Sequence, residues 1–279
     1  MTRGVGVNHG PQHSASRGRI TSPSNPQVKA IRALRDRKER ERTGHCYVEG
    51  IRAVAAALES GVHVHQIVVA TDLLASDFAR DVVRSAERRG AAIMEVSPSV
   101  FQSISSKDGP QGLALVACQK WVHLSDVRLA PTGVWLALSA SQDAGNVGSI
   151  LRTCDAVRVT GVVLVGPSVD PYDPSSLRAS TGAAFTIPLA RASWSDFAAW
   201  IAREQVPLVG ATGDAPTSYR AAEYPPRLVL LMGSERDGLS DAQQASCSLL
   251  VHIPMRGTVD SLNLAVATSL ILYEIFGHR

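Results

Sequence analysis

Residues 249–263 read LLVHIPMRGTVDSLN, an apolar run that changes abruptly into a polar loop. The first part, Leu249–Ile253, is short and apolar on both faces, as parallel strands are when helices cover both sides of their sheet. Ligands of open α/β sheets bind outside the carboxyl ends of the strands, so the loop that begins at Pro254 is a candidate binding segment. Residues 261–276 then form a run of helical length that is apolar nearly all round. This run predicts a helix buried in the core or against a second subunit.

Four similar apolar runs precede this strand and extend the pattern toward the N-terminus. They are Val134–Leu138, Val162–Val165, Leu208–Ala211 and Leu228–Met232. Helices are expected among these strands, at Val147–Val157, Trp194–Arg203 and Asp241–Ser246. The alternation of strands and helices predicts an α/β domain with a mostly parallel sheet over residues 132–279.

The N-terminal half of the chain shows a second alternation of short strands and helices. Strands are expected at Cys46–Val48, Gln66–Ala70, Ala92–Val96 and Leu113–Cys118, and helices at Ile51–Ser60, Leu73–Arg89 and Pro98–Ile104. This pattern predicts a small α/β domain over residues 21–120. Residues 121–131 are expected to link it to the larger domain.

Charge is distributed unevenly along the chain. Residues 1–44 contain ten Lys or Arg and three Asp or Glu, a net of +7, whereas the whole chain carries only +3. Residues 1–20 are expected to form a disordered basic tail, and a helix is expected to run from Asn25-Pro26 to Gly44. Its candidate contacts with the phosphates of a nucleic acid are Lys29, Arg32, Arg35, Arg37 and Lys38. The alternative is a solvated helix whose arginines pair with neighbouring glutamates.

Several other chemistries lack a sequence signature. The four cysteines and eight histidines are scattered without a CxxC or HExxH pattern, which argues against a disulfide framework and against a metal site. No Rossmann glycine pattern, P-loop or GxSxG elbow occurs. Cys154 is interpreted as a buried structural thiol, and the tryptophans as core anchors. Because no run reaches the roughly 18 apolar residues of a membrane span and no secretory signal is evident, a cytoplasmic enzyme is expected.

Three loops at predicted strand ends are rich in glycine, asparagine and charged residues. They are Gln142–Arg152, Gly233–Ser240 and Pro254–Asn263. Because the carboxyl ends of parallel strands share one edge of a sheet, these loops can converge on a single site. Such a site would be lined by backbone groups and small side chains, which suits a ligand with a neutral purine and a compact sulfonium centre.

The three loops resemble motifs 1, 2 and 3 of the SpoU/TrmH branch of the SPOUT methyltransferases. The matching residues are Asn146-x-Gly148-x-x-x-Arg152, Gly233-x-Glu235-x-x-Gly238-Leu239 and Ile253-Pro254-Met255-x-Gly257-x-x-x-Ser261-Leu262-Asn263. The similarity spans about residues 134–276, and Ser180-x-Gly182-Ala183 resembles the family's intermediate segment. Ala144 departs from the family, which often has proline at this position. More loosely, the N-terminal domain resembles the ribosomal-protein-like domain with which many members bind their substrate.

The resemblance implies a fold, a cofactor and an oligomeric state. The C-terminal sheet would carry a deep trefoil knot, and the protein would be a homodimer with its site near the subunit boundary. Members of this family hold S-adenosylmethionine in the knot loops, at positions that match Gly233, Ile253 and Leu262. Further expected contacts of this cofactor are Met232, Gly238 and Met255.

The resemblance also implies a reaction, the metal-independent transfer of a methyl group from S-adenosylmethionine to a ribose 2′-hydroxyl of RNA. Arg152 would take the leading catalytic role. Asn146, Ser261 and Asn263 would hold the target nucleotide and nearby loops, and Glu235 would orient motif 1. A guanidinium, with a pKa above about 12, keeps its proton in a protein, so we expect Arg152 to clamp a substrate phosphate instead of acting as a base. The alternative is that Arg152 only pairs with Asp155 on the same helix.

Three functions are compatible with this resemblance: methylation of 23S ribosomal RNA, methylation of transfer RNA, and RNA binding without catalysis. The separate N-terminal domain favours 23S ribosomal RNA, because the minimal transfer-RNA enzymes of this branch often lack one. The presence of Arg152, Asn146 and Asn263 argues against a silent binding protein. Similarity to actinomycete resistance methylases, together with a composition of 24 Arg to 4 Lys, adds the hypothesis of protection against a ribosome-targeting antibiotic.

Overall fold

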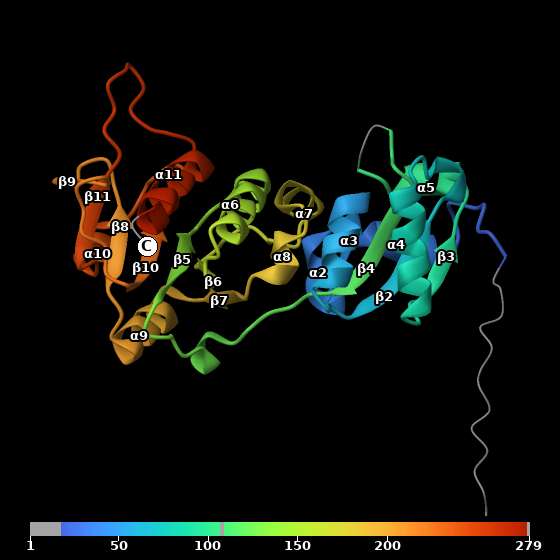
Figure 1. Ribbon diagram of the computed structural model, residues 1–279, viewed down its shortest axis with the longest axis horizontal. Helices are drawn as coiled ribbons and strands as arrows, with labels where there is room; N and C mark the ends of the chain where they lie inside the picture. The colour runs from blue at the N-terminus through green and yellow to red at the C-terminus, as the bar shows by residue number, and fades with distance from the viewer. Residues whose placement is uncertain (1–17, 107–108, 278–279) are drawn as a thin grey trace, which may run out of the picture.

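The computed structural model describes residues 18–106 and 109–277, which fold into two α/β domains (Figure 1). The N-terminal domain contains four strands in the order β1-β4-β2-β3. Their bounds are β1 His45–Glu49, β2 Val64–Val69, β3 Ile93–Glu95 and β4 Leu113–Cys118. Strand β4 is antiparallel to both β1 and β2, whereas β2 and β3 are parallel. The predicted small α/β domain is confirmed.

Helices cover both faces of this sheet, because its strands alternate apolar side chains between the two faces. On one face, α3 (Ile51–Glu59) and α4 (Asp77–Arg88) share a core with Ile67. On the other face, α1 (Pro26–Ala33) and α5 (Pro98–Ile104) share a core with Val68. The short helix η1 (Thr71–Leu73) precedes α4, which begins at Asp77 and not at Leu73 as predicted.

The expected basic helix is interrupted, so the prediction of a single helix is wrong. It forms α1 and a second helix, α2 (Arg37–Thr43). The break lies at Asp36, whose extended backbone and side-chain hydrogen bond of 2.8 Å from the Lys38 amide make it the cap of the second helix. Helix α2 ends where predicted, at Gly44, whose left-handed φ of +67° favours glycine. Of the expected disordered tail, residues 1–17 lie outside the described residues, while Ile20 already pairs with Val96.

The C-terminal domain is built on a parallel sheet of seven strands in the order β7-β6-β5-β10-β8-β11-β9. Their bounds are β5 Gly133–Ser139, β6 Gly161–Val165, β7 Leu189–Ala192, β8 Leu208–Ala211, β9 Thr217–Ser218, β10 Arg227–Met232 and β11 Leu249–His252. The five predicted strands of a mostly parallel sheet are confirmed. The sequence did not predict β7 and β9, which form the two edges of the sheet.

Helices cover this sheet on both faces as well. They are α6 Ala144–Ala156, α7 Pro174–Ser180, α8 Ala183–Thr186, α9 Trp194–Glu204, α10 Asp241–Ala245 and α11 Leu264–Gly277. Helices α6 and α11 share a core with Leu136, whereas α9 packs on the opposite face, where the rings of Trp135 and Trp200 lie 5.5 Å apart. Both tryptophans are buried, as predicted of core anchors, whereas Trp121 and Trp194 are only half-buried.

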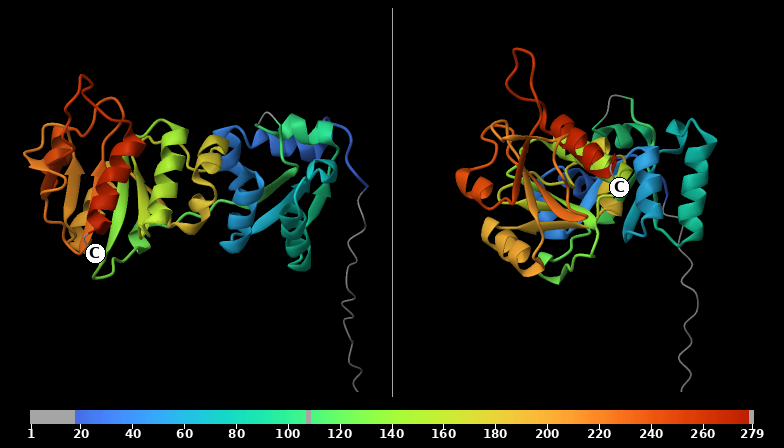
Figure 2. Two further views of the ribbon diagram at one scale, coloured as in Figure 1. Left: turned by 45° about the horizontal axis from the view of Figure 1, so that its top comes forward. Right: turned by 60° about the vertical axis from the view of Figure 1, so that its left-hand side comes forward.

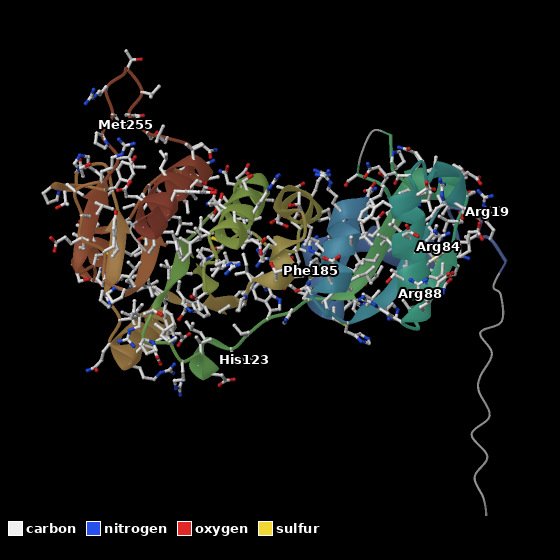
Figure 3. All side chains as sticks on the ribbon, viewed as in Figure 1. Arg19, Arg84, Arg88, His123, Phe185 and Met255 are labelled. Carbon is white, nitrogen blue, oxygen red and sulfur yellow. The ribbon has the colours of Figure 1, made fainter. Side chains whose placement is uncertain are left out.

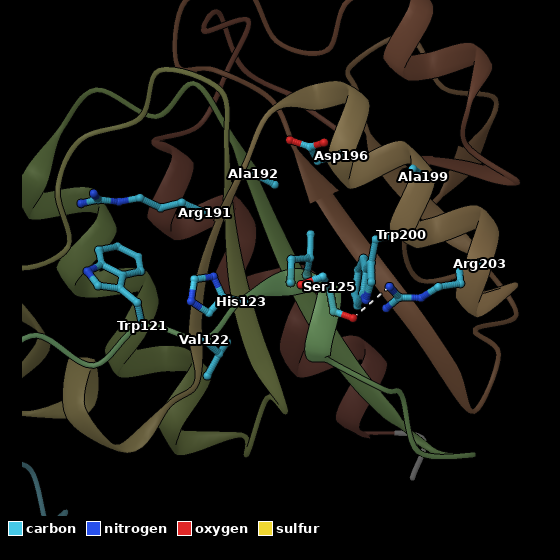
Figure 4. Close-up of a pocket in the computed structure, with 11 residues that line it drawn as sticks. Trp121, Val122, His123, Ser125, Arg191, Ala192, Asp196, Ala199, Trp200 and Arg203 are labelled. Carbon is cyan, nitrogen blue, oxygen red and sulfur yellow. Dashed lines mark hydrogen bonds between the residues drawn. The ribbon is translucent and has the colours of Figure 1, made fainter.

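The predicted linker packs closely against the C-terminal domain. It contains a short helix, η2 (Leu124–Asp126), whose Leu124 is buried in the same cluster as Trp200. Arg203 of α9 donates a hydrogen bond of 3.0 Å to the carbonyl oxygen of Ser125 (Figure 4). This segment therefore covers part of the α9 face of the sheet.

The last helix, α11, is apolar on its buried face and on part of its exposed face. It begins after Asn263, whose side chain accepts hydrogen bonds of 2.9 and 3.3 Å from the next-turn amides of Ala265 and Val266. The loop before it projects from the domain in every view (Figures 1 and 2) and carries Met255 (Figure 3). Among the residues that the structure describes, no helix combines the length and the apolarity that a membrane crossing requires.

Candidate active site

A cavity of about 640 Å³ lies at the carboxyl ends of β8, β10 and β11. All three loops that the sequence singled out contribute to its wall. The lining residues are Asn146 of the first loop, Gly233, Ser234, Glu235, Arg236 and Gly238 of the second, and Met255, Asp260, Ser261, Leu262 and Asn263 of the third. Met232, Ile253 and Ala267 lie between them. The three loops therefore converge on one site.

The sequence analysis missed one part of this wall. Ala211, Thr212 and Gly213 follow β8 and also line the cavity. Since β8 lies between β10 and β11 in the sheet, the loop after it must reach the same edge. The sequence did contain a signal for this loop, because Gly213 follows a predicted strand here, as Gly233 does after β10.

The six expected cofactor contacts, Met232, Gly233, Gly238, Ile253, Met255 and Leu262, all line the cavity. Gly233 is sterically required, because a Cβ atom there would lie 2.2 Å from the carbonyl carbon of Gly238. Met255 and Leu262 are each 37% exposed, so the wall that the third loop forms is open to solvent.

The Glu235 carboxylate is held by the first loop of the site. It accepts hydrogen bonds of 2.9 Å from the Ser141 hydroxyl, 3.2 Å from the Gln142 amide and 3.4 Å from the Asn146 side-chain amide. Burial alone would raise the pKa of Glu235, but the hydrogen bonds that it accepts outweigh burial and lower its pKa below the usual value. Glu235 therefore stays ionised and orients the start of α6.

A second contact joins the first loop to the third. The Asn263 side chain donates a hydrogen bond of 2.9 Å to the side-chain oxygen of Asn146. The Asn146 backbone is held in turn by Asp143, which caps α6 with a hydrogen bond of 2.6 Å from the Asn146 amide. Glu235, Asn146 and Asn263 thus form one continuous hydrogen-bonded chain across all three motifs, which we call the motif chain.

Arg152 and Ser261 occupy different places at the site. Ser261 lines the cavity, and its hydroxyl donates a hydrogen bond of 3.3 Å to Asp260. Arg152 is exposed on α6 and is not part of the cavity wall. Within the described residues it makes no ion pair, and Asp155, its alternative partner, accepts a hydrogen bond of 2.7 Å from Thr186. The Arg152 guanidinium is therefore free of the intrahelical pairing considered above.

The expected nucleic-acid contacts of the basic segment divide into two groups. Arg32 and Arg35 donate hydrogen bonds to Ser103 and Ser105, and Arg37 to Ser168, so these arginines hold the fold together. Lys29 and Lys38 are exposed, and their ammonium groups have no hydrogen bond or ion pair with any described residue. Phosphate binding by this segment stays a prediction, and the two lysines are its best candidates.

Cys154 does not contribute to the wall of the cavity. Cys154 is fully buried in the core, and burial raises the pKa of its thiol, as expected of a structural cysteine. In the described part of the chain, no three His, Cys, Asp or Glu residues cluster in a way that could hold a metal ion.

Several solved structures that superpose on both domains are named as RNA methyltransferases. An rRNA methyltransferase from Sinorhizobium meliloti with bound AdoMet superposes with a TM-score of 0.85 and 34% identity, covering 93% of this chain and 97% of that one. The SpoU methyltransferase AviRb from Streptomyces viridochromogenes superposes with a TM-score of 0.82 and 28% identity, over 91% and 98% of the chains. The fold and the site therefore define an RNA methyltransferase.

The sequence comparisons identify the family. The model of the SpoU rRNA Methylase family matches residues 133–273, and that of the MRM3-like substrate binding domain matches residues 25–115. The 23S rRNA (guanosine(2553)-2′-O)-methyltransferase RlmP of Bacillus subtilis is 29% identical over 258 residues, which cover 92% of this chain and 99% of that protein. This chain belongs to the SpoU rRNA methylase family, as its three motifs predicted.

Proposed function

We propose that this protein transfers the methyl group of S-adenosylmethionine to a ribose 2′-hydroxyl of 23S ribosomal RNA. The convergence of the three motif loops on one cavity carries the proposal. The relatives from Bacillus subtilis and Streptomyces viridochromogenes are named as 2′-O-methyltransferases of 23S rRNA, which supports the choice of substrate. In bacteria such as these two, ribosomal RNA is made in the cytoplasm, so this substrate also supports a cytoplasmic enzyme.

The cavity fits the proposed cofactor in size and in chemistry. Its volume of about 640 Å³ falls within the range of small-molecule sites. Met232, Ile253 and Leu262 would hold the apolar parts of the cofactor, and the backbone near Gly233 and Gly238 would hold its polar groups. When bound, S-adenosylmethionine would supply an electrophilic methyl carbon on a sulfonium.

The residues of the chain would then position the ribose and its phosphates. The motif chain holds the loops in one arrangement before substrate arrives, which lowers the cost of reaching the reactive geometry. Arg152 stays protonated and would clamp an RNA phosphate so that the 2′-hydroxyl faces the cavity. Its exposed position outside the cavity wall suits a contact with RNA better than a contact with the cofactor.

The exposed face of α11 supports a homodimer. Val266, Leu270 and Tyr273 are 48%, 38% and 59% exposed, and their spacing places them on one side of the helix. This helix also borders the cavity through Ala267 and Ile271, so a partner subunit docked on α11 would lie close to the site. Contiguous apolar residues of this kind mark association surfaces.

Methyl transfer from isotope-labelled S-adenosylmethionine to purified RNAs tests the proposed function. We expect label in 23S ribosomal RNA and none in transfer RNA, and alkaline hydrolysis should leave the bond after the labelled nucleotide intact. Label in transfer RNA would favour the transfer-RNA enzyme. Absence of label in every RNA would favour a silent binding protein.

The trefoil knot and antibiotic protection stay predictions of the family resemblance. Growth of a susceptible bacterium that expresses the protein, in the presence of ribosome-targeting antibiotics, would test the second of them. We expect raised inhibitory concentrations only for drugs that bind near the methylated nucleotide.

A further inference from the structure

A buried ionic cluster joins the two domains. Arg40 on α2 is 1% exposed, and so is Asp170 in the loop between β6 and α7. Their Nε and Oδ2 atoms lie 2.8 Å apart, and Arg40 Nη2 lies 3.3 Å from Oδ2 of Asp173 in the same loop. A buried arginine that reaches two carboxylates of the other domain fixes one orientation of the domains, because its planar donors accept few geometries.

Two further donors of Arg40 are satisfied within the N-terminal domain. Its Nη1 donates hydrogen bonds of 3.0 and 2.8 Å to the carbonyl oxygens of Leu34 and Arg35, between α1 and α2. The same guanidinium therefore contacts the segment between α1 and α2 and, on its other side, two carboxylates of the catalytic domain. We call Arg40, Asp170 and Asp173 the domain lock.

Further contacts secure the domain lock from the side of the linker. Asp170 Oδ1 lies 3.1 Å from Nη2 of Arg191, whose guanidinium stacks 3.9 Å from the ring centre of Trp121 (Figure 4). The Tyr172 hydroxyl accepts a hydrogen bond of 2.9 Å from the Lys120 amide and donates one of 2.8 Å to the Lys120 carbonyl. These contacts fix the first residues of the linker against the C-terminal domain.

The domain lock is connected to the catalytic motif through α7. The Asp173 side chain caps α7 with a hydrogen bond of 2.9 Å from the Ser175 amide. Helix α7 lies so close to α6 that a Cβ atom at Gly148 would be 2.4 Å from the carbonyl oxygen of Ser176. Helix α6 carries Asn146 and Arg152. The position of these two residues relative to the N-terminal domain therefore depends on the contacts that run from Asp173 through α7 to α6.

A second close approach keeps the domains from sliding. Gly182, just before α8, has a φ of +106°, and a Cβ atom there would be 2.3 Å from the Cβ of Ala56 on α3. Figure 3 shows Phe185 of α8 at this boundary between the domains. The N-terminal domain is therefore docked, with no room for a larger residue at the contact.

We propose that Arg40 is a positioning residue for methyl transfer, because it sets the orientation in which the N-terminal domain presents RNA to α6. The inference rests on the proposed function. A buried ion pair is weak evidence for stability, since apolar residues can replace it at little cost, but it can specify a single geometry. Arg40 lies outside the cavity wall, so its effect on catalysis is indirect; an effect through domain orientation requires an RNA that reaches both domains, whereas an effect through α7 and α6 does not.

The test compares Arg40→Met with Arg42→Met, the same change on the same helix. Arg42 is exposed, and its only ion pair among the residues that the structure describes is with Glu39, within its own helix. Each variant is assayed on full-length 23S ribosomal RNA and on a short hairpin that contains the methylated nucleotide but is too small to reach both domains. For Arg40→Met we expect kcat/KM for full-length RNA to fall about tenfold or more, because misplacement of a substrate by about 1 Å can cost about a hundredfold in rate. On the hairpin we expect wild-type kinetics, and Arg42→Met should match wild type on both RNAs.

The affinity for S-adenosylmethionine, measured by calorimetry, should stay the same in Arg40→Met, since the cavity is untouched. Equal losses on both RNAs, or equal behaviour of the two variants, would overturn the inference. If Arg40→Met does not fold, Asp173→Asn replaces it, because asparagine retains the cap of α7 while removing a charge from the domain lock. It should show the same selective loss on full-length RNA, and wild-type kinetics on both RNAs would refute the role. A wild-type protein that methylates no RNA would instead contradict the proposed function, and the inference with it.

Discussion

At the scale of single residues, the site depends on how three polar side chains hold one another. Glu235 accepts from Asn146, and Asn146 accepts from Asn263, so each group fixes the next. The sequence placed these residues at one site through the family resemblance, and the structure supplies the contacts between them. Those contacts could not be read from the chain, because the three residues are separated by 89 and 117 positions along it.

Arg152 gives the sharpest prediction at this scale. Arg152→Ala should reduce methyl transfer more than about a hundredfold, because the phosphate clamp that orients the ribose is lost. The affinity for S-adenosylmethionine should stay the same, since Arg152 does not line the cavity. Single-turnover rates and calorimetry measure the two effects. Near-wild-type turnover of Arg152→Lys would argue against a bidentate clamp, because an ammonium cannot reproduce it.

The lowered pKa of Glu235 predicts how the rate of methyl transfer depends on pH. Its pKa is lowered in the folded protein, so the hydrogen-bonded carboxylate persists at neutral pH and is lost only as the pH falls through that lowered value. The single-turnover rate should therefore show no decline due to Glu235 between pH 8 and its unperturbed pKa of about 4.3. Glu235→Gln should lower the rate about tenfold or more at every pH, because an amide accepts weaker hydrogen bonds than a carboxylate. A rate that falls with a midpoint near pH 6 in wild type, and not in Glu235→Gln, would contradict this account.

At the scale of helices and strands, apolar patterns predicted most of the elements that position the site. Five strands of the C-terminal domain stand out because they are short apolar runs of a buried parallel sheet. Four of its helices were predicted as well, whereas α7 and α8 were missed. Strand β7 was missed because the charged Arg191 interrupts its apolar run, and β9 because it has only two residues. The basic helix was predicted as one because the basic run continues across Asp36, although aspartate favours N-caps over helix interiors and Asp36 caps α2 here.

Helix α11 carries the prediction that belongs to this scale. Leu270→Asp should convert the protein from a dimer to a monomer, because a charge would have to be buried on the proposed contact face. Sedimentation equilibrium measures the change. Phe78→Asp is the matched control, since Phe78 is equally apolar and 55% exposed but lies on α4 in the other domain. A wild-type protein that is monomeric at all concentrations would remove the basis for this dimer.

At the scale of the whole molecule, the chain is a catalytic domain with a second domain locked to it. The sequence predicted both domains and the charge of the N-terminal segment. It did not predict their docking, because Arg40 looks like one more member of a basic surface until its partners 130 and 133 positions away are known. The same structure shows that three of the five expected RNA-binding residues serve the fold.

RNA binding by the two remaining lysines is a prediction about the whole molecule. The double variant Lys29→Ala/Lys38→Ala should bind 23S ribosomal RNA more weakly, and its affinity should depend less steeply on salt, by about one to two units of the log–log slope. Filter binding over a range of KCl concentrations gives both quantities. Arg128→Ala serves as the control, because this exposed arginine lies in the segment that covers the α9 face. Equal slopes for the double variant and wild type would exclude the lysines from the RNA contact.

The central claim is that one cavity, built by three converging loops, brings a methyl donor to a ribose hydroxyl beside Arg152. It is tested most directly by digesting 23S ribosomal RNA, labelled by this protein from S-adenosylmethionine, to nucleosides and identifying the labelled one by mass spectrometry. The account predicts a single 2′-O-methylated nucleoside, which disappears when Arg152→Ala replaces wild type. A labelled base on an unmodified ribose would contradict it.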